Sequence, residues 1–209
     1  MFRFKTSSQH KNWWAQRKID WDAQYLQTWN HPHRQLIIWA LQSFNWTSLW
    51  EVGCGPGPNL VRIAKEMKGK QLGGSDINPD AIALARKTFS GGKFNVESIE
   101  DVLLSDNAVD IILSDAALIY VGPRKIQKVL KEMTRMARQG IVLCEFHGKS
   151  WWQRMWLRLK TGYYAYDYEK LLTEAGCYDI RMVKIPPSHW EGFPWQPWGY
   201  IIMARVTKI

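Results

Sequence analysis

Leu49-Trp50-Glu51-Val52-Gly53-Cys54-Gly55-Pro56-Gly57 is the most informative stretch of the chain, because a short apolar run leads into three glycines within five residues. Glycine at such a corner lets the backbone turn sharply and lets a ligand lie against main-chain N–H groups. A helix-like segment follows, and a second apolar run ends at Asp76, 19 residues after Gly57. An acid at this spacing, at the end of the next strand, suits the two hydroxyls of a ribose. The pattern predicts a strand-loop-helix-strand unit that binds a nucleoside.

The glycine loop also narrows the choice of nucleoside cofactor. The dinucleotide fingerprint G-x-G-x-x-G fails because its last position is Pro58, and the phosphate loop G-x-x-x-x-G-K-[ST] does not occur in the sequence. What remains is E-x-G-x-G-x-G, which begins at Glu51. Glu51 and Asp76 would repel a pyrophosphate, but they suit an ammonium group and ribose hydroxyls.

This loop resembles motif I of the class I S-adenosylmethionine (SAM) methyltransferases, and the resemblance continues through the following strands and helices. It implies SAM as cofactor, which carries a ribose and an amino group but no phosphate. The cofactor-binding residues that the resemblance implies are Glu51, Gly53, Cys54, Gly55, Gly57, Asn59, Asp76, Ile77, Ser98, Ile99, Glu100 and Ser114. In the family, the residues after the third strand flank the adenine, and an acid often leads them. Here Ser98 leads, so Ser98, Glu100 and Asp101 stay open as adenine contacts.

The rest of the chain alternates between strand-like and helix-like patterns. Helical spacing occurs in Leu60–Met67, Ile126–Ala137 and Tyr168–Ala175. Apolar runs typical of strands are Val109–Leu113, Ile141–Phe146, Ile180–Ile185 and Tyr200–Val206. Such alternation predicts an α/β fold, with a parallel sheet covered by helices on both faces. The family resemblance adds that the sheet is Rossmann-like, mostly parallel and seven-stranded, with an antiparallel last strand.

A chain of 209 residues and 24.5 kDa suits one domain with a substantial core. We expect residues 1–47 to form an N-terminal helical cap on a SAM-binding methyltransferase domain of residues 48–209. Residues 148–166 and 186–198 are expected to be insertions that cover the substrate. No apolar stretch is long enough for a transmembrane helix, and the first residues lack the apolar core of a signal peptide, so a cytoplasmic location is expected.

The three cysteines, Cys54, Cys144 and Cys177, are far apart in the sequence and odd in number. Neither a metal site nor a disulfide framework is expected from them. They are predicted to be small buried thiols.

All 13 tryptophans lie outside residues 51–150. Charge is divided in the same way, because residues 51–147 carry a net +1 and the flanks carry +8 of the overall +9. Plain packing of the flanks on the sheet explains many tryptophans. Three partners also suit aromatic, basic flanks: an anionic or sugar-like small substrate, RNA, or a membrane surface contacted through residues 151–160. Trp190, Trp195 and Trp198 are the better ligand candidates because they share an irregular Pro-rich loop.

Two side chains fall where a base could accept a proton from a substrate. His147 follows the predicted strand Ile141–Phe146, and an imidazole titrates near neutral pH. Asp115 lies just after the predicted strand Val109–Leu113. His31 and His33 flank Pro32 at a predicted helix start, where capping is their expected role. Further candidates for orienting a substrate are Tyr25, Tyr120 and Tyr163.

The sequence therefore predicts a SAM-dependent methyltransferase that acts on oxygen or nitrogen of a small or sugar-like metabolite. Gly53–Leu60, with Leu118–Val121 and Glu145–His147, resembles methyltransferases of nonulosonic sugar pathways, which favours a sugar-like acceptor. The alternatives are a tRNA or rRNA methyltransferase, a membrane-associated lipid or quinone methyltransferase, and a SAM-binding partner protein without turnover. RNA is not favoured, because Ser114–Ala117 departs from the Asn/Asp-Pro-Pro-Tyr pattern used on base amines and the chain has no Pro-Cys pair.

Overall fold

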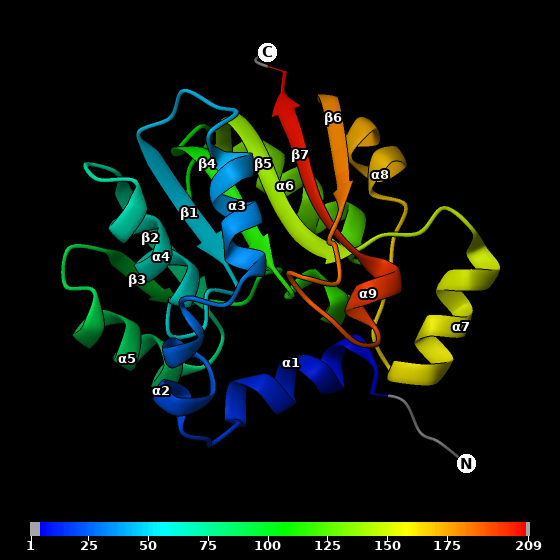
Figure 1. The fold of residues 1–209 in the computed structure, drawn as a ribbon, viewed down its shortest axis with the longest axis horizontal. Helices are drawn as coiled ribbons and strands as arrows, with labels where there is room; N and C mark the ends of the chain where they lie inside the picture. Colours follow the sequence, from blue (N-terminus) through cyan, green and yellow to red (C-terminus); the bar gives the residue numbers. More distant parts are fainter. Residues whose placement is uncertain (1–4, 208–209) are drawn as a thin grey trace.

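A seven-stranded sheet runs through the middle of the protein (Figure 1). The computed structural model describes residues 5–207. The strands are β1 (Ser48–Val52), β2 (Gln71–Asp76), β3 (Lys93–Val96), β4 (Val109–Asp115), β5 (Ala137–Phe146), β6 (Cys177–Lys184) and β7 (Gly199–Val206). They lie in the order β3-β2-β1-β4-β5-β7-β6, and β7 is antiparallel to both of its neighbours. The predicted α/β fold with an antiparallel last strand is confirmed.

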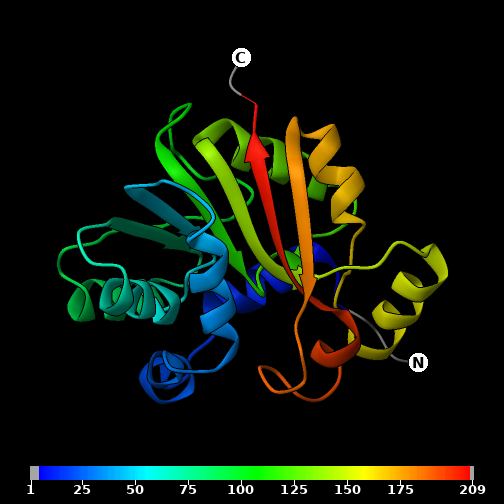
Figure 2. The same cartoon turned by 45° about the horizontal axis from the view of Figure 1, so that its top comes forward.

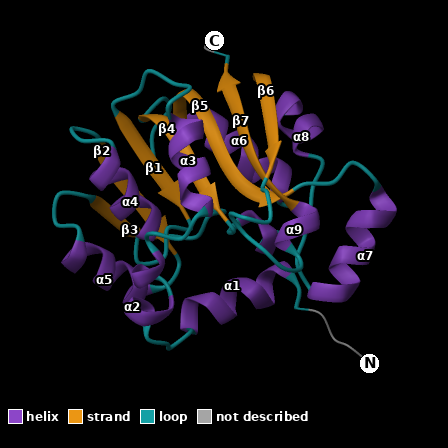
Figure 3. Cartoon of the chain, viewed as in Figure 1, coloured by secondary structure: helices purple, strands orange, loops and turns teal. Residues whose placement is uncertain are grey.

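Helices cover both faces of the sheet (Figure 3). One face carries α3 (His33–Leu41), α4 (Pro58–Glu66) and α5 (Pro79–Thr88), and the other carries α6 (Ile126–Met136) and α8 (Tyr168–Glu174). Side chains of the central strands alternate between the two layers. Leu49 and Ile111 belong to the first core, whereas Trp50 and Ile112 belong to the second. Strands buried on both faces explain why their sequences read as continuous apolar runs.

The remaining helices gather near the carboxyl ends of the parallel strands (Figure 1). They are α1 (Ser7–Gln16), α2 (Trp21–Gln24), α7 (Trp151–Thr161), α9 (Trp195–Trp198) and the 3-10 turns η1 (Leu26–Thr28) and η2 (Leu118–Tyr120). Helix α1 begins with a reciprocal capping box between Thr6 and Gln9. Among the helices of residues 5–207, none has the length and apolarity that spanning a bilayer requires.

The predicted boundary between the Ile126–Ala137 helix and the Ile141–Phe146 strand is wrong. Helix α6 ends at Met136 and β5 begins at once with Ala137, which pairs with Val109 of β4. The extended backbone of Ala137 already belongs to the sheet, so the intervening residues pair instead of forming a loop. The three cysteines are free and buried, as predicted.

Asn78 ties the N-terminal helices to the sheet domain. Its Oδ1 caps α5 by accepting the backbone N–H groups of Asp80 and Ala81 at 3.0 and 3.1 Å. Its Nδ2 donates to the carbonyls of Trp14 and Arg17 at 2.8 and 2.9 Å. Asn78 is 1% exposed, so one buried amide serves a helix cap and a long-range contact together.

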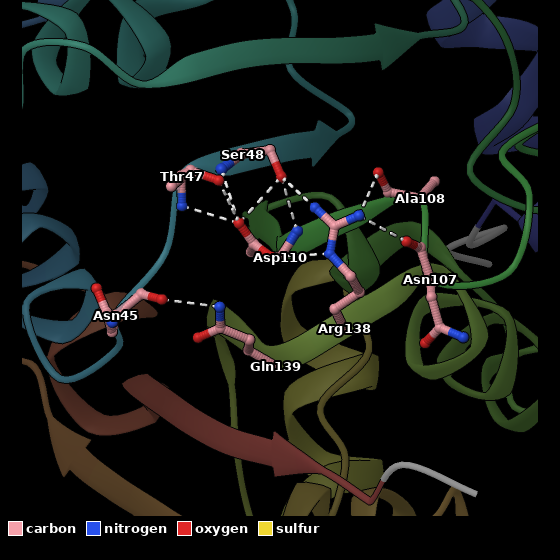
Figure 4. Close-up of polar contacts among 8 residues, drawn as sticks. All are labelled: Asn45, Thr47, Ser48, Asn107, Ala108, Asp110, Arg138 and Gln139. Atoms are coloured by element: carbon pink, nitrogen blue, oxygen red, sulfur yellow. Dashed lines mark hydrogen bonds and ion pairs between the residues drawn. The ribbon is translucent and has the colours of Figure 1, made fainter.

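Asp110 links β1, β4 and β5 at the opposite end of the strands, where β1 and β4 begin (Figure 4). Its Oδ2 accepts the backbone N–H and the hydroxyl of both Thr47 and Ser48 at 2.8–3.2 Å. Arg138 of β5 donates through Nε to Oδ1 at 2.8 Å. Burial alone would raise the pKa of Asp110, but these hydrogen bonds hold it below its ordinary value. The network is satisfied by the protein itself, which indicates a structural role.

Candidate functional site

A cavity of about 430 Å³ opens at the carboxyl edge of the sheet. Open α/β sheets bind ligands at this edge. Ten predicted cofactor residues line the cavity: Glu51, Gly53, Cys54, Gly55, Asn59, Asp76, Ile77, Ser98, Ile99 and Glu100. The N-terminal helices and the segment 186–198 supply the facing walls.

The glycine loop has the strained geometry that its sequence predicts. Gly53, Gly55 and Gly57 have φ angles of +73°, +53° and +86°, which side chains disfavour. A Cβ on Gly53 would lie 2.5 Å from the Cβ of Ala117. Gly57 does not line the cavity and serves as the N-cap position of α4. In this structure Gly57 shapes the loop, and its direct contact with a cofactor stays a prediction.

Ser114, predicted as a cofactor contact, lies away from the cavity in this structure. It is fully buried, it does not line the cavity, and its Oγ donates to Glu145 Oε1 at 2.9 Å. The same oxygen of Glu145 accepts the N–H groups of Ala117 and Leu118, both at 3.0 Å. Ser114 therefore helps to hold the turn after β4 and does not face a ligand.

Three acids at the ends of neighbouring strands face the cavity. Glu51 Oε1 accepts Asn59 Nδ2 at 2.6 Å, but its Oε2 has no hydrogen-bond partner among residues 5–207, and burial raises the pKa of Glu51 to about 8. Asp76 accepts the N–H groups of Gly55 and Asn78 at 2.9 and 2.8 Å, and burial raises its pKa. Glu97 Oε2 likewise has no hydrogen-bond partner in the described part of the chain.

Glu97 was not identified from the sequence, because the expected adenine contacts begin at Ser98. β3 ends at Val96, which pairs with Asp76 at the end of β2, so Glu97 lies one residue beyond the paired strand ends. Of the three candidates for the adenine contact, Asp101 does not line the cavity and Glu100 is paired with Lys125 at 2.6 Å. Glu97 and Ser98 are therefore the polar side chains near the end of β3 that are better able to accept a hydrogen bond from a ligand.

A hydrogen-bonded chain of two imidazoles and a carboxylate crosses one wall of the cavity. His33 Nε2 lies 2.9 Å from Asp115 Oδ2, and His33 Nδ1 lies 2.6 Å from His31 Nδ1. Asn59 Nδ2 donates to the same oxygen of Asp115 at 2.9 Å. Burial alone would raise the pKa of Asp115, but His33, Arg34 and Asn59 hold it below its ordinary value. Asp115 is therefore a carboxylate, and His33 Nε2 carries a proton toward it.

The protonation of the chain follows from this end. Burial lowers the pKa of both imidazoles, that of His31 to about 4, so both rings are neutral near pH 7. Because His33 is neutral and its Nε2 donates to Asp115, the Nδ1 of His33 has a lone pair. That lone pair accepts a hydrogen bond from the Nδ1–H group of His31. The Nε2 of His31 is then the lone-pair nitrogen of the chain. The capping role expected for these histidines is wrong, since Pro32 occupies the N-cap of α3 and no side chain caps it.

His33, Asp115 and Cys144 also have the spacing of a metal-ligand set, because their ligand atoms lie within 4.8 Å of one another. However, the Asp115 oxygen nearest His33 already accepts two hydrogen bonds, and the buried Arg34 adds positive charge beside it. Burial raises the pKa of the Cys144 thiol well above its usual range. This donor set suits a charged hydrogen-bond network better than a cation.

Aromatic rings form much of the remaining wall. Trp190 stacks on Trp195 at 3.7 Å with an interplanar angle of 11°, and its ring lies 4.2 Å from that of His33. The other aromatic side chains that line the cavity are Trp14, Trp21, Tyr25, Tyr120, Phe146 and Tyr163. The three tyrosines predicted to orient a substrate are thus among them. Trp198 is buried and does not line the cavity, in contrast to its predicted role.

His147, predicted as a base, lies outside this cavity, so its role as a base is not carried into the proposal. It is buried and does not line the cavity. Its Nδ1 accepts the backbone N–H of Tyr168 at 3.3 Å, and its ring packs against Tyr200. The end of β5 directs this imidazole into the packing of α8, whereas Asp115 at the end of β4 reaches the cavity.

Residues 50–140 match the family described as "Methyltransferase domain". No curated protein matches the chain. The magnesium protoporphyrin IX methyltransferase of Synechocystis PCC 6803, solved with bound SAM, superposes with a TM-score of 0.65 and 13% identity over 96% of this chain and 97% of that one. A SAM-dependent methyltransferase from Methanosarcina mazei superposes with a TM-score of 0.63 and 21% identity, over 83% of this chain and 98% of that one. The [4+2]-cyclase SpnF superposes with a TM-score of 0.69 and 17% identity over 97% of each chain. At these identities the solved structures show a shared fold.

Proposed function

We propose that the chain is a class I SAM-dependent methyltransferase that methylates an oxygen or nitrogen of a small, ring-containing acceptor. The match of residues 50–140 to a methyltransferase family and the shared fold support this proposal. The cofactor is SAM, which supplies an electrophilic methyl group on a sulfonium. The stacked indoles of Trp190 and Trp195 suit either an aromatic ring or the apolar face of a sugar.

The residues at the cavity fit this cofactor. The partnerless Glu51 Oε2 would pair with the amino group, which would also favour the ionised carboxylate. Asp76 would accept from the ribose hydroxyls, because a carboxylate has about four accepting sites and the backbone N–H groups around it do not fill them all. Glu97, Ser98 and Ile99 would flank the adenine, and the glycines at 53 and 55 leave the main chain accessible.

The observation that carries the proposal is the chain from His31 through His33 to Asp115. Methylation of a hydroxyl requires that its proton be accepted as the new bond forms. We assign the lone pair of His31 Nε2 to this role. The Nδ1 proton of His31 would move to His33 Nδ1, and the resulting imidazolium would lie beside the Asp115 carboxylate. Such pairing stabilises an imidazolium as in hydrolases that use a His-Asp pair.

Turnover with a panel of acceptors tests the proposal. The panel would hold phenols, catechols, hydroxybenzoates, sugar acids and amines, and formation of S-adenosylhomocysteine (SAH) would be measured by mass spectrometry. We expect His33→Asn to slow turnover of a hydroxyl acceptor about 100-fold, a typical general-base contribution, with little change in SAH affinity. His189→Ala is the matched control, since His189 lies on a loop and does not line the cavity.

Two outcomes would contradict the proposal. If His33→Asn turned over a hydroxyl acceptor at the wild-type rate, the histidine chain would have no role in proton transfer. If SAH bound tightly but no acceptor in a broad panel were methylated, the alternative of a SAM-binding partner protein would be favoured instead.

A further inference from the structure

Helix α7 exposes an apolar stripe that nothing in the described chain covers. Trp152, Met155, Trp156 and Leu159 follow the spacing i, i+3, i+4, i+7, which places them on one face of the helix. Their exposed fractions are 75%, 40%, 48% and 56%, whereas Leu157 is the only buried residue of the helix. Figure 2 shows α7 standing to one side of the sheet.

Two further exposed rings extend the stripe, one at the start of α7 and one from another segment. Trp151 is 52% exposed, and its ring lies 4.4 Å from that of Trp152. Phe193, which is 53% exposed, lies 5.7 Å from Trp156 and comes from the segment 186–198 that also carries the indoles of the cavity wall. The exposed rings therefore form one patch that reaches the vicinity of the cavity.

Within residues 148–166 every charged side chain is basic, and Lys149 is paired with Glu169 at 2.6 Å. Residues 148–166 contain Lys149, Arg154, Arg158 and Lys160 and no Asp or Glu. The ammonium of Lys160 lies 6.0 Å from the centre of the Trp156 ring. A short helix with Trp and Leu on one face, Lys and Arg on the rest, and low net hydrophobicity is typical of segments that lie in a membrane interface.

We propose that α7 docks the protein on the surface of an anionic phospholipid bilayer. The indoles and Leu159 would enter the headgroup boundary, and the exposed Lys160 beside Trp156 would pair with a lipid phosphate. A second copy of the chain fits less well, because two such helices would bring like charges together. A protein partner fits less well too, since one face of an 11-residue helix is small beside the roughly 800 Å² per partner of a stable interface.

Docking through α7 would bring segment 186–198 toward the lipid as well. An acceptor dissolved in the bilayer interface would then have a short route to the cavity. This consequence rests on the proposed function, whereas the docking itself does not.

Vesicle flotation with the full chain tests the docking. We expect the protein to float with vesicles of phosphatidylcholine and phosphatidylglycerol (7:3) and to stay behind with phosphatidylcholine alone. The double variant Trp152→Ala/Trp156→Ala should lower the partition coefficient by roughly tenfold or more, because binding scales with the apolar area inserted. Trp39→Ala is the matched control, since Trp39 is a 44% exposed tryptophan on α3.

The charge contribution is tested separately. Lys160→Glu should weaken binding to the anionic vesicles about fivefold or more, and high salt should weaken wild-type binding. Lys87→Glu, on the exposed side of α5, makes the same charge change elsewhere and should bind nearly as the wild type.

The proposal is overturned if the chain does not float with anionic vesicles, or if the double tryptophan variant floats as well as the wild type. It is also overturned if the wild type forms a dimer without lipid that this variant abolishes, because the stripe would then contact a second copy. Near-ultraviolet circular dichroism would verify that the variants are folded, and SAH affinity should not change in any of them.

Discussion

Glu51→Gln should stabilise the ligand-free protein at neutral and alkaline pH and weaken SAM binding. Glu51 is 1% exposed, and burial raises the pKa of its carboxyl from 4.5 to about 8. A folded-state pKa above the unfolded value means that the carboxyl favours the fold fully below about pH 4.5. That contribution is lost as the pH rises through about 8. Glutamine has no proton to lose, so the variant should lack this part of the pH dependence.

The size of the effect follows from the two values. They differ by about 3.5, and at ~1.4 kcal/mol for each pKa unit the full contribution is about 5 kcal/mol. About 3 kcal/mol of it falls between pH 5 and pH 8. The 2.6 Å bond from Asn59 can be kept by the glutamine oxygen, but the new N–H group would cost about 1–3 kcal/mol if unpaired. The difference in unfolding free energy, variant minus wild type, should therefore grow by roughly 3 kcal/mol across this range.

Urea unfolding of both proteins from pH 5 to pH 8 measures this difference. Calorimetry adds a second readout, because an ammonium group near Glu51 would lower the pKa of its carboxyl. Binding of SAH by the wild type at pH 7 should then release a proton, detected as a dependence of the heat on the ionisation enthalpy of the buffer. The variant should release less. Parallel pH profiles for the two proteins, with equal proton release, would refute the assignment of Glu51.

Three further predictions concern other residues. Asp76→Ala should weaken SAH binding at least tenfold by calorimetry, while Asp101→Ala, outside the cavity, should not. Asn78→Ala should lower the unfolding free energy by about 2–3 kcal/mol and speed amide exchange in α1, since it removes a cap and two long-range hydrogen bonds. Asp110→Asn should lower the free energy of unfolding by about 2–4 kcal/mol at pH 7. This loss should shrink in acid, because the stabilisation from a lowered folded-state pKa is complete above the ordinary pKa of the carboxyl and disappears as the pH falls through the folded-state pKa. Urea unfolding at several pH values measures it.

The sheet was predictable because its physical determinants are local. Val109–Leu113 and Ile141–Phe146 are apolar on both faces, and the glycines after β1 require a backbone that few other turns use. These signals survive any arrangement of the flanks. The antiparallel β7 came from the family resemblance, because an apolar strand such as Ile201–Ala204 reads the same in either direction.

The cofactor side of the cavity was predictable for a similar reason. Residues that follow parallel strands meet at one edge, so Glu51, Asp76 and Ser98 could be placed together by counting strands. The errors arose where one residue decides the direction of a side chain. Glu97 lies one residue before the predicted adenine contacts, and Ser114 lies one residue before Asp115, the side chain that reaches the cavity.

The imidazole chain could not be predicted from its own neighbourhood. His33 contacts Asp115, 82 positions away, through a helix start that in isolation indicates only capping. A composition that is aromatic and basic says that the flank packs or binds, but not which side chain lies beside which strand end. The register between α3 and β4 depends on packing over the whole sheet face, including α4 and β7.

The distribution of unsatisfied polar atoms separates the functional edge of the sheet from the structural one. Within residues 5–207, the cavity-lining side chains that carry a buried nitrogen or oxygen without a hydrogen-bond partner are Trp14, Trp21, Arg34, Glu51, Asn59, Glu97 and Asp115. At the opposite end of the strands, both oxygens of Asp110 accept hydrogen bonds. Leaving buried polar groups unpaired is costly, so folding alone would not favour their concentration at one edge. A polar ligand that pairs with them explains why buried polar groups lack partners at the carboxyl ends of the strands, whereas Asp110 at the other end is fully hydrogen-bonded.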